Sequence, residues 1–96
     1  MTEARLPTGW TLQAIRDVSG DRGAVPLDAA GRTVMWLTCP GEVDERLDPE
    51  IVLGFHSLCI VKPVDDEDWY MGSLNADGGV DCWNAYDSLF EALRGL

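Results

Sequence analysis

The sequence has little positive charge. Seven Lys and Arg residues stand against 17 Asp and Glu residues, which gives a net charge of -10 over 96 residues. A field of that sign repels nucleic acids and anionic membrane surfaces, and it attracts basic proteins and cations. The composition therefore argues against direct binding to nucleic acid or to a membrane surface.

The chain also lacks paired cysteines and a long apolar run. Cys39, Cys59 and Cys82 form an odd, widely spaced set with no Cys-x-x-Cys pair. That pattern is typical of reduced thiols in the cytoplasm rather than of a secreted disulfide framework. The longest apolar segment, IVLGFHSLCIV at 51–61, is shorter than the roughly 18 residues that a membrane span needs, and no basic, apolar leader begins the sequence. We expect a cytoplasmic protein.

What is present suits one folded domain over residues 1–96. The chain is 46% hydrophobic and contains four Trp residues, which supply large apolar surfaces for a core. Two separate cores would each be too small to be stable at this length.

Local signals predict two helices and several strands. Thr8 or Thr11 can cap a first helix whose apolar positions run from Leu12 to Val18, and Ser19-Gly20 ends it. The β-branched and aromatic segment 32–38 is typical of a strand. Between the two, residues 20–31 contain three Gly and one Pro, which indicates a long connection. After the strand, residues 39–50 are expected to form a charged loop.

The segment 49–61 has conflicting signals. Asp48-Pro49-Glu50 is a good helix start, whereas the following residues are rich in β-branched side chains. We expect one turn of helix at 49–54 and a strand at 57–62, and helix or strand stays open for the segment as a whole.

The C-terminal third has the clearest pattern. Asp77-Gly78 between two aromatic-containing runs indicates a β-hairpin, because these residues tolerate the positive φ that such turns need. Ser88 followed by Glu91 is a capping box that begins a final helix. The predicted fold is α+β: a small antiparallel sheet with an N-terminal helix and a C-terminal helix packed on it.

Metal and catalytic motifs are weak. His56 and Cys59 could join Cys39 and Cys82 in a zinc set, but His56 and Cys59 would point to opposite faces of a strand. Residues 73–84 overlap the EF-hand pattern, although the hairpin turn explains the same residues without an ion. His56 is the only histidine and lies in the most apolar segment, and no glycine-rich phosphate loop is present. The sequence predicts no metal, no cofactor and no enzyme, with a small metal-binding protein as a remote alternative.

Acidic residues cluster in the middle of the chain. Nine of the 17 acids lie between positions 42 and 68, where only Arg46 and Lys62 oppose them. The run DDEDWY at 65–70 sets four carboxylates beside two aromatic side chains, a composition typical of a surface that docks a basic protein. Trp69 is expected to be the first core residue of the hairpin, with Tyr70 on the other side. The candidate partner-binding residues are Asp65, Asp66, Glu67, Asp68 and Tyr70, supported by Glu42, Asp44 and Glu45.

The C-terminal sequence GGVDCWNAYDSLFEALRGL resembles the closing hairpin and helix of small acidic bacterial immunity-type proteins. The W-x-x-Y-x-x-L-x-x-A-L pattern corresponds to Trp83, Tyr86, Leu89, Ala92 and Leu93. The likeness covers about a fifth of the chain and consists mostly of core and cap residues. It implies an immunity or inhibitor protein that neutralises a toxin, a nuclease or another basic effector, without identifying any binding residue. Self-association, as a homodimer or a subunit of a larger assembly through apolar surface at 51–61, is the alternative.

Overall fold

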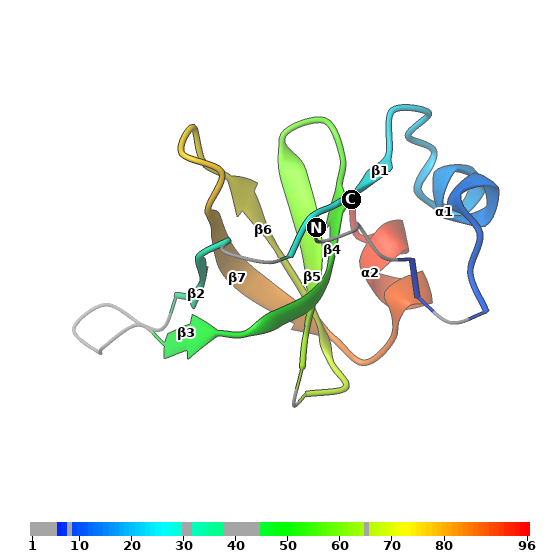
Figure 1. Cartoon of the computed structure of the whole chain (residues 1–96). Helices are drawn as coiled ribbons and strands as arrows, with labels where there is room; N and C mark the ends of the chain where they lie inside the picture. Colours follow the sequence, from blue (N-terminus) through cyan, green and yellow to red (C-terminus); the bar gives the residue numbers. More distant parts are fainter. Residues whose placement is uncertain (1–5, 8, 30–31, 38–44, 65) are drawn as a thin grey trace.

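The computed structural model describes residues 6–7, 9–29, 32–37, 45–64 and 66–96, with the backbone alone at Glu45. In these residues the fold comprises two short helices and seven strands (Figure 1). In chain order they are α1 (Leu12–Ser19), β1 (Val25–Leu27), β2 (Val34–Trp36), β3 (Glu45–Leu47), β4 (Pro49–Gly54), β5 (Leu58–Pro63), β6 (Trp69–Leu74), β7 (Val80–Tyr86) and α2 (Leu89–Arg94).

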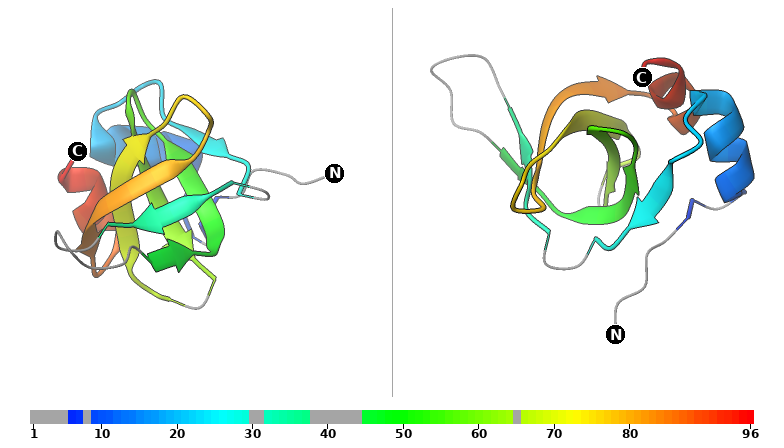
Figure 2. Two further views of the ribbon diagram at one scale, coloured as in Figure 1. Left: turned by 90° about the vertical axis from the view of Figure 1, so that its left-hand side faces the viewer. Right: turned by 90° about the horizontal axis from the view of Figure 1, so that it is seen from above.

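The strands form one curled sheet in the order β1-β4-β5-β6-β7-β2-β3. All neighbours are antiparallel except β2 and β7, which run parallel. Only Asp48 separates β3, at one edge of the sheet, from β4, which is next to the opposite edge strand β1. This continuity bends the sheet round on itself, as Figure 2 shows.

The α+β class is confirmed, but the sheet is larger than predicted and is mixed rather than wholly antiparallel. The prediction of a helical turn at 49–54 was wrong, since this segment is strand β4. Ile51, Val52 and Leu53 are all buried because β4 lies between β1 and β5 and is covered on both faces. Pro49 begins the strand, which is a position where a missing N–H is tolerated. The connection 20–31 and the charged loop 39–50 were also expected to lack strands, yet they contain β1 and β3.

Two hydrophobic clusters stabilise the fold, one on each face of the sheet. The inner cluster fills the curl with Val34, Leu47, Val52, Cys59, Val61, Val80 and Cys82. The outer cluster joins the helices to β4, β5 and β6 through Ile15, Ile51, Leu53, Ile60, Trp69, Met71, Leu89 and Leu93. A strand whose side chains alternate between two such clusters is buried on both faces, which accounts for the near-continuous apolar runs in β4 and β5.

Both helices have the caps that the sequence predicts. The Ala14 N–H donates to Thr11 Oγ1 over 3.1 Å at the start of α1, and Gly20 ends the helix with a φ of 75°. The Glu91 N–H donates to Ser88 Oγ over 3.2 Å at the start of α2. The two helices contact each other, and α2 packs on β6 and β7. Within the described ranges, neither helix has the length and apolarity needed to cross a membrane.

Candidate protein-binding site

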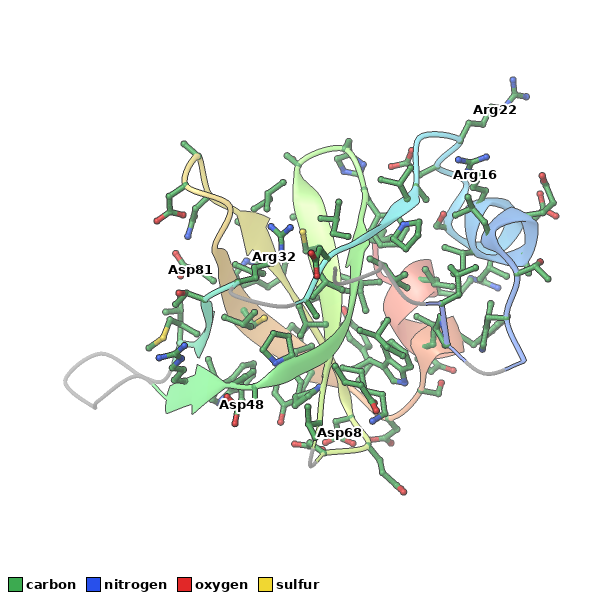
Figure 3. The ribbon with its side chains drawn as sticks, in the orientation of Figure 1. Arg16, Arg22, Arg32, Asp48, Asp68 and Asp81 are labelled. Carbon is green, nitrogen blue, oxygen red and sulfur yellow. The ribbon has the colours of Figure 1, made fainter. Side chains whose placement is uncertain are left out.

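The connection between β5 and β6 presents carboxylates at one end of the curled sheet. The Val64 N–H donates to the Asp48 carbonyl oxygen over 2.8 Å, which ties this connection to the junction of β3 and β4. Asp48 therefore lies beside the described residues of the connection. We call Asp48, Val64, Asp66, Glu67 and Asp68 the acidic turn. Figure 3 shows Asp48 and Asp68 toward the lower edge of the molecule.

Asp66 organises the acidic turn from within. Its carboxylate accepts hydrogen bonds from the Tyr70 hydroxyl over 2.6 Å and from the Asp68 N–H over 2.9 Å. These bonds, the Tyr70 bond most of all, lower the pKa of Asp66 below its ordinary value. The hydrogen bonds favour the charged form of the carboxylate, which in turn stabilises the backbone of the turn.

Trp69 and Tyr70 lie on opposite faces of β6, as expected for consecutive residues of a strand. Trp69 is 8% exposed and belongs to the outer cluster, which confirms the prediction that it is a core residue. Tyr70 is half-buried and packs against the inner cluster, with its ring perpendicular to that of Trp36 at a centroid distance of 5.0 Å. Tyr70 thus anchors the acidic turn to the inside of the curl.

The acidic turn contains one exposed apolar side chain along with its carboxylates. Val64 is 60% exposed, Glu67 and Asp48 are exposed, and Asp68 is half-buried. An exposed apolar group in the same turn as several carboxylates suits a basic protein surface, because the charges steer the encounter and the apolar group is desolvated on contact.

The structure places only some of the predicted binding residues. It brings together Asp66, Glu67, Asp68 and Tyr70, whereas Asp65, Glu42 and Asp44 lie outside the described residues. Glu45 is located by its backbone at the start of β3. Asp48, which the sequence suggested as a helix cap, was missed because its position depends on the continuity of β3 with β4.

A cleft of about 590 Å³ lies between the N-terminal segment, β4, β5 and the start of α2. Its apolar lining comprises Leu6, Pro7, Trp10, Ile51, Trp69 and Leu89. Its polar lining comprises Glu50, Lys62, Asp87 and Ser88.

Lys62 links this cleft to the acidic turn. Its Nζ donates to Glu50 Oε2 over 2.9 Å and to the Pro63 carbonyl oxygen over 3.2 Å. Its positive charge also contributes to the lowered pKa of Asp66. The cleft and the acidic turn are therefore neighbours, joined through Lys62 and through Trp69, which follows Asp68 directly in the sequence.

The charges on the described surface are unevenly distributed. Figure 3 shows Arg16 and Arg22 at the upper right of the molecule, away from Asp48 and Asp68. Lys62, whose charge acts on Asp66, is half-buried and paired with Glu50, whereas Arg46, two residues before Asp48, is exposed. The labelled arginines Arg16 and Arg22 thus lie in a different region from the acidic turn.

Trp83 forms a second exposed feature, on the outer face of β7. The register passes from Met71 opposite Asn84 to Gly72 opposite Cys82, so Trp83 is the extra residue of a β-bulge. Its side chain is 48% exposed, and its indole N–H donates to Ser73 Oγ over 3.4 Å. A bulge changes the direction of a side chain, and sequence periodicity gives no sign of one.

Of the residues considered for metal binding or catalysis, Cys39 lies outside the described residues, and His56 is separate from the two buried cysteines. Cys59 and Cys82 are fully buried in the inner cluster, and burial raises the pKa of their thiols to about 11 and about 12. His56 is exposed, and both its Nδ1 and its backbone N–H lie 3.0 Å from Asp21 Oδ2. Among the residues that the structure describes, no group of three or more His, Cys, Asp or Glu side chains could hold a metal ion.

Comparison with known proteins returned no relationship: no family model matches the chain, and no curated protein or solved structure is significantly similar to it.

Proposed function

We propose that this chain is a small acidic binding protein that neutralises a basic partner, such as a toxin, a nuclease or another effector, by covering part of its surface. The observation that supports this proposal most directly is the acidic turn, where Asp48, Glu67 and Asp68 occur together with the exposed Val64. The net charge of -10 supports it too, because long-range attraction accelerates association with a cationic surface. The C-terminal resemblance to immunity-type proteins favours the same class.

In this proposal the residues at the turn have two different roles. Asp66 and Tyr70 are bonded to each other and hold the turn in shape. Glu67, Asp48 and Asp68 are the groups that meet the partner, together with Val64 as the desolvated contact. The contributions of Asp65, Glu42, Asp44 and Glu45 stay predictions from the sequence.

The test compares two double variants that remove the same number of charges. In the first, Asp48→Asn and Glu67→Gln neutralise the exposed part of the acidic turn. In the second, Asp17→Asn and Asp77→Asn neutralise two exposed acids on α1 and in the β6–β7 turn, at the other end of β6. Asn retains the side-chain oxygen that accepts from Gln13 Nε2 at 17 and from the Gly79 N–H at 77.

Candidate partners are basic proteins captured from a lysate of the native host, and each is then purified and measured directly. The first pair should slow association several-fold at low ionic strength and reduce its salt dependence, while the second pair should have a much smaller effect. Stoichiometric addition of the wild-type protein should also inhibit the partner's activity. Equal effects of the two pairs would show that net charge alone, and not the acidic turn, governs binding.

Trp83 offers a competing location for the same function. Trp83→Ser removes the exposed indole and leaves the acidic turn intact. If this variant weakens binding while the pair at Asp48 and Glu67 does not, the interface lies on the outer face of β7 and the proposed site is wrong.

Self-association has less support as a function. The apolar segment 51–61 was its expected surface, but its large apolar side chains are buried or half-buried in β4, β5 and the residues between them. Static light scattering that shows a monomer at micromolar concentration would remove this alternative.

A further inference from the structure

We infer that the cleft beside the acidic turn is a receptor for one arginine side chain of the basic partner. This inference rests on the proposed function, since it names the group that the partner inserts. The cleft has a volume of about 590 Å³ and combines indole surfaces with carboxylates, which together suit a cation that has an apolar stem.

The aromatic part of the cleft comes from two distant segments of the chain. Trp10 is half-buried, and its backbone N–H donates to the Pro7 carbonyl oxygen over 3.0 Å in a tight turn before α1. Trp69 is fixed in the outer cluster at the start of β6. Both side chains line the cleft and are held by the fold before any ligand arrives, so a ligand would not have to order them.

The charged part of the cleft favours a cation. Glu50 and Asp87 contribute two carboxylates, and Lys62 contributes one ammonium group. The ammonium is engaged by Glu50 Oε2 and the Pro63 carbonyl oxygen. Asp87 is exposed and makes no ion pair with any residue in the described ranges. The lining is therefore net negative, and the adjacent acidic turn increases that potential.

Arginine fits this lining better than lysine. A guanidinium is planar, stacks on aromatic faces and gives up its hydration more readily than an ammonium group. Its fork of N–H donors can also bond a carboxylate such as Asp87 while the methylene stem contacts Leu6 or Leu89. The acidic turn would then steer the partner, and the cleft would hold one of its arginines.

The test uses a small probe and no partner protein. N-acetyl-arginine amide supplies the guanidinium side chain, and N-acetyl-citrulline amide is its uncharged equivalent of nearly the same shape. The arginine probe is titrated into ¹⁵N-labelled protein, and we expect saturable shifts centred on the indole N–H signals of Trp10 and Trp69, with a Kd in the millimolar range. The citrulline probe should give no saturable shift.

Two single variants give opposite expectations. Lys62→Gln removes the ammonium group of Lys62 from the lining and should tighten binding of the arginine probe by about threefold. Asp87→Asn removes a carboxylate and should weaken binding by about threefold. Asp17→Asn, outside the cleft, should leave the Kd unchanged. Thermal unfolding of each variant verifies that the fold is retained.

The outcomes separate this inference from the function on which it rests. Equal binding of the two probes, or weaker binding after Lys62→Gln, would overturn the arginine site, because neither result fits recognition of a cation. Turn variants that leave partner association unchanged would overturn the proposed function, yet they have no bearing on a probe that binds the cleft alone.

Discussion

The Tyr70 hydroxyl donates a hydrogen bond to Asp66 Oδ2 over 2.6 Å, and this bond joins the inside of the curled sheet to its acidic turn. Tyr70 is four residues further along the chain, with its ring against Trp36 in the inner cluster. The run of carboxylates is thus ordered by a tyrosine that the sequence suggested as a binding residue. Asp66, one of the acids of that run, is thereby bonded within the molecule.

Tyr70→Phe should raise the pKa of Asp66 toward its ordinary value of 3.8 and destabilise the protein by about 1 kcal/mol or less, since the bond is close to solvent. The ring contact with Trp36 is retained. A carboxyl group whose pKa is lowered on folding stabilises the protein at pH values above its ordinary pKa. This stabilisation is lost as pH falls through the lowered folded value, so the difference in stability between wild type and variant should shrink below about pH 4. Carboxyl ¹³C NMR and urea unfolding measure the two effects. An unchanged Asp66 pKa would contradict the assigned role of the hydroxyl.

Elements with local signals could be predicted from the sequence. The β6–β7 hairpin depends on Asp77-Gly78, where Gly78 has a φ of 90°, and α2 depends on the Ser88 cap. Strands β1 and β3 have three residues each and exist because β4 and β2 pair with them. Nothing within such short segments distinguishes them from loops, so only the assembled sheet reveals them.

The candidate site likewise has one part that the sequence predicts and another that depends on the assembled fold. The acids at 66–68 are visible as a run in the sequence, and their place in a connection follows from the flanking strands. The partnership of Asp48 with this turn depends on a backbone bond to Val64, and the cleft joins Leu6 to Leu89. The proximity of such distant positions depends on how the strands, the N-terminal segment and α2 assemble, which no local pattern encodes.

Gly72→Ala should be one of the most damaging small substitutions in the chain. A Cβ at Gly72 would lie 2.1 Å from the Asp81 carbonyl oxygen and 2.6 Å from Cys82 Cα, both of which are backbone atoms of β7. Relief requires β6 and β7 to separate at the bulge, and we expect a loss of about 3 kcal/mol in the free energy of unfolding. Ser73→Ala, the neighbouring change at a half-buried position, should cost less than about 1 kcal/mol. Similar urea midpoints for the two variants would contradict this close approach.

Cys59 and Cys82 should resist alkylation while the protein is folded. With thiol pKa values raised to about 11 and about 12, only about one Cys59 in a thousand is a thiolate at pH 8, and both side chains are fully buried. The measurement uses a Cys39→Ser variant, so that only these two thiols remain. Iodoacetamide should label neither within an hour in buffer and both in guanidinium chloride. Rapid labelling of the folded variant would mean that the curl opens readily.

Asp21→Asn should lower the melting temperature at neutral pH by weakening the contact between the loop after α1 and the turn between β4 and β5. Asp21 Oδ2 accepts from the His56 backbone N–H over 3.0 Å and lies 3.0 Å from His56 Nδ1. The bonds to His56, with a smaller contribution from the Gly23 N–H, lower the pKa of Asp21. Asn can keep the bond to Gly23, but the amide nitrogen that replaces Oδ2 is a donor facing a donor.

The stabilisation from Asp21 is present above the ordinary pKa of 3.8 and is lost as pH falls through the lowered folded value. Wild type should therefore melt at a higher temperature than Asp21→Asn at pH 7, and the gap should narrow toward pH 3. Circular dichroism melts at the two pH values measure it. A gap that is constant across this range would mean that the charge of Asp21 contributes nothing to the contact and that the side chain acts through its shape alone.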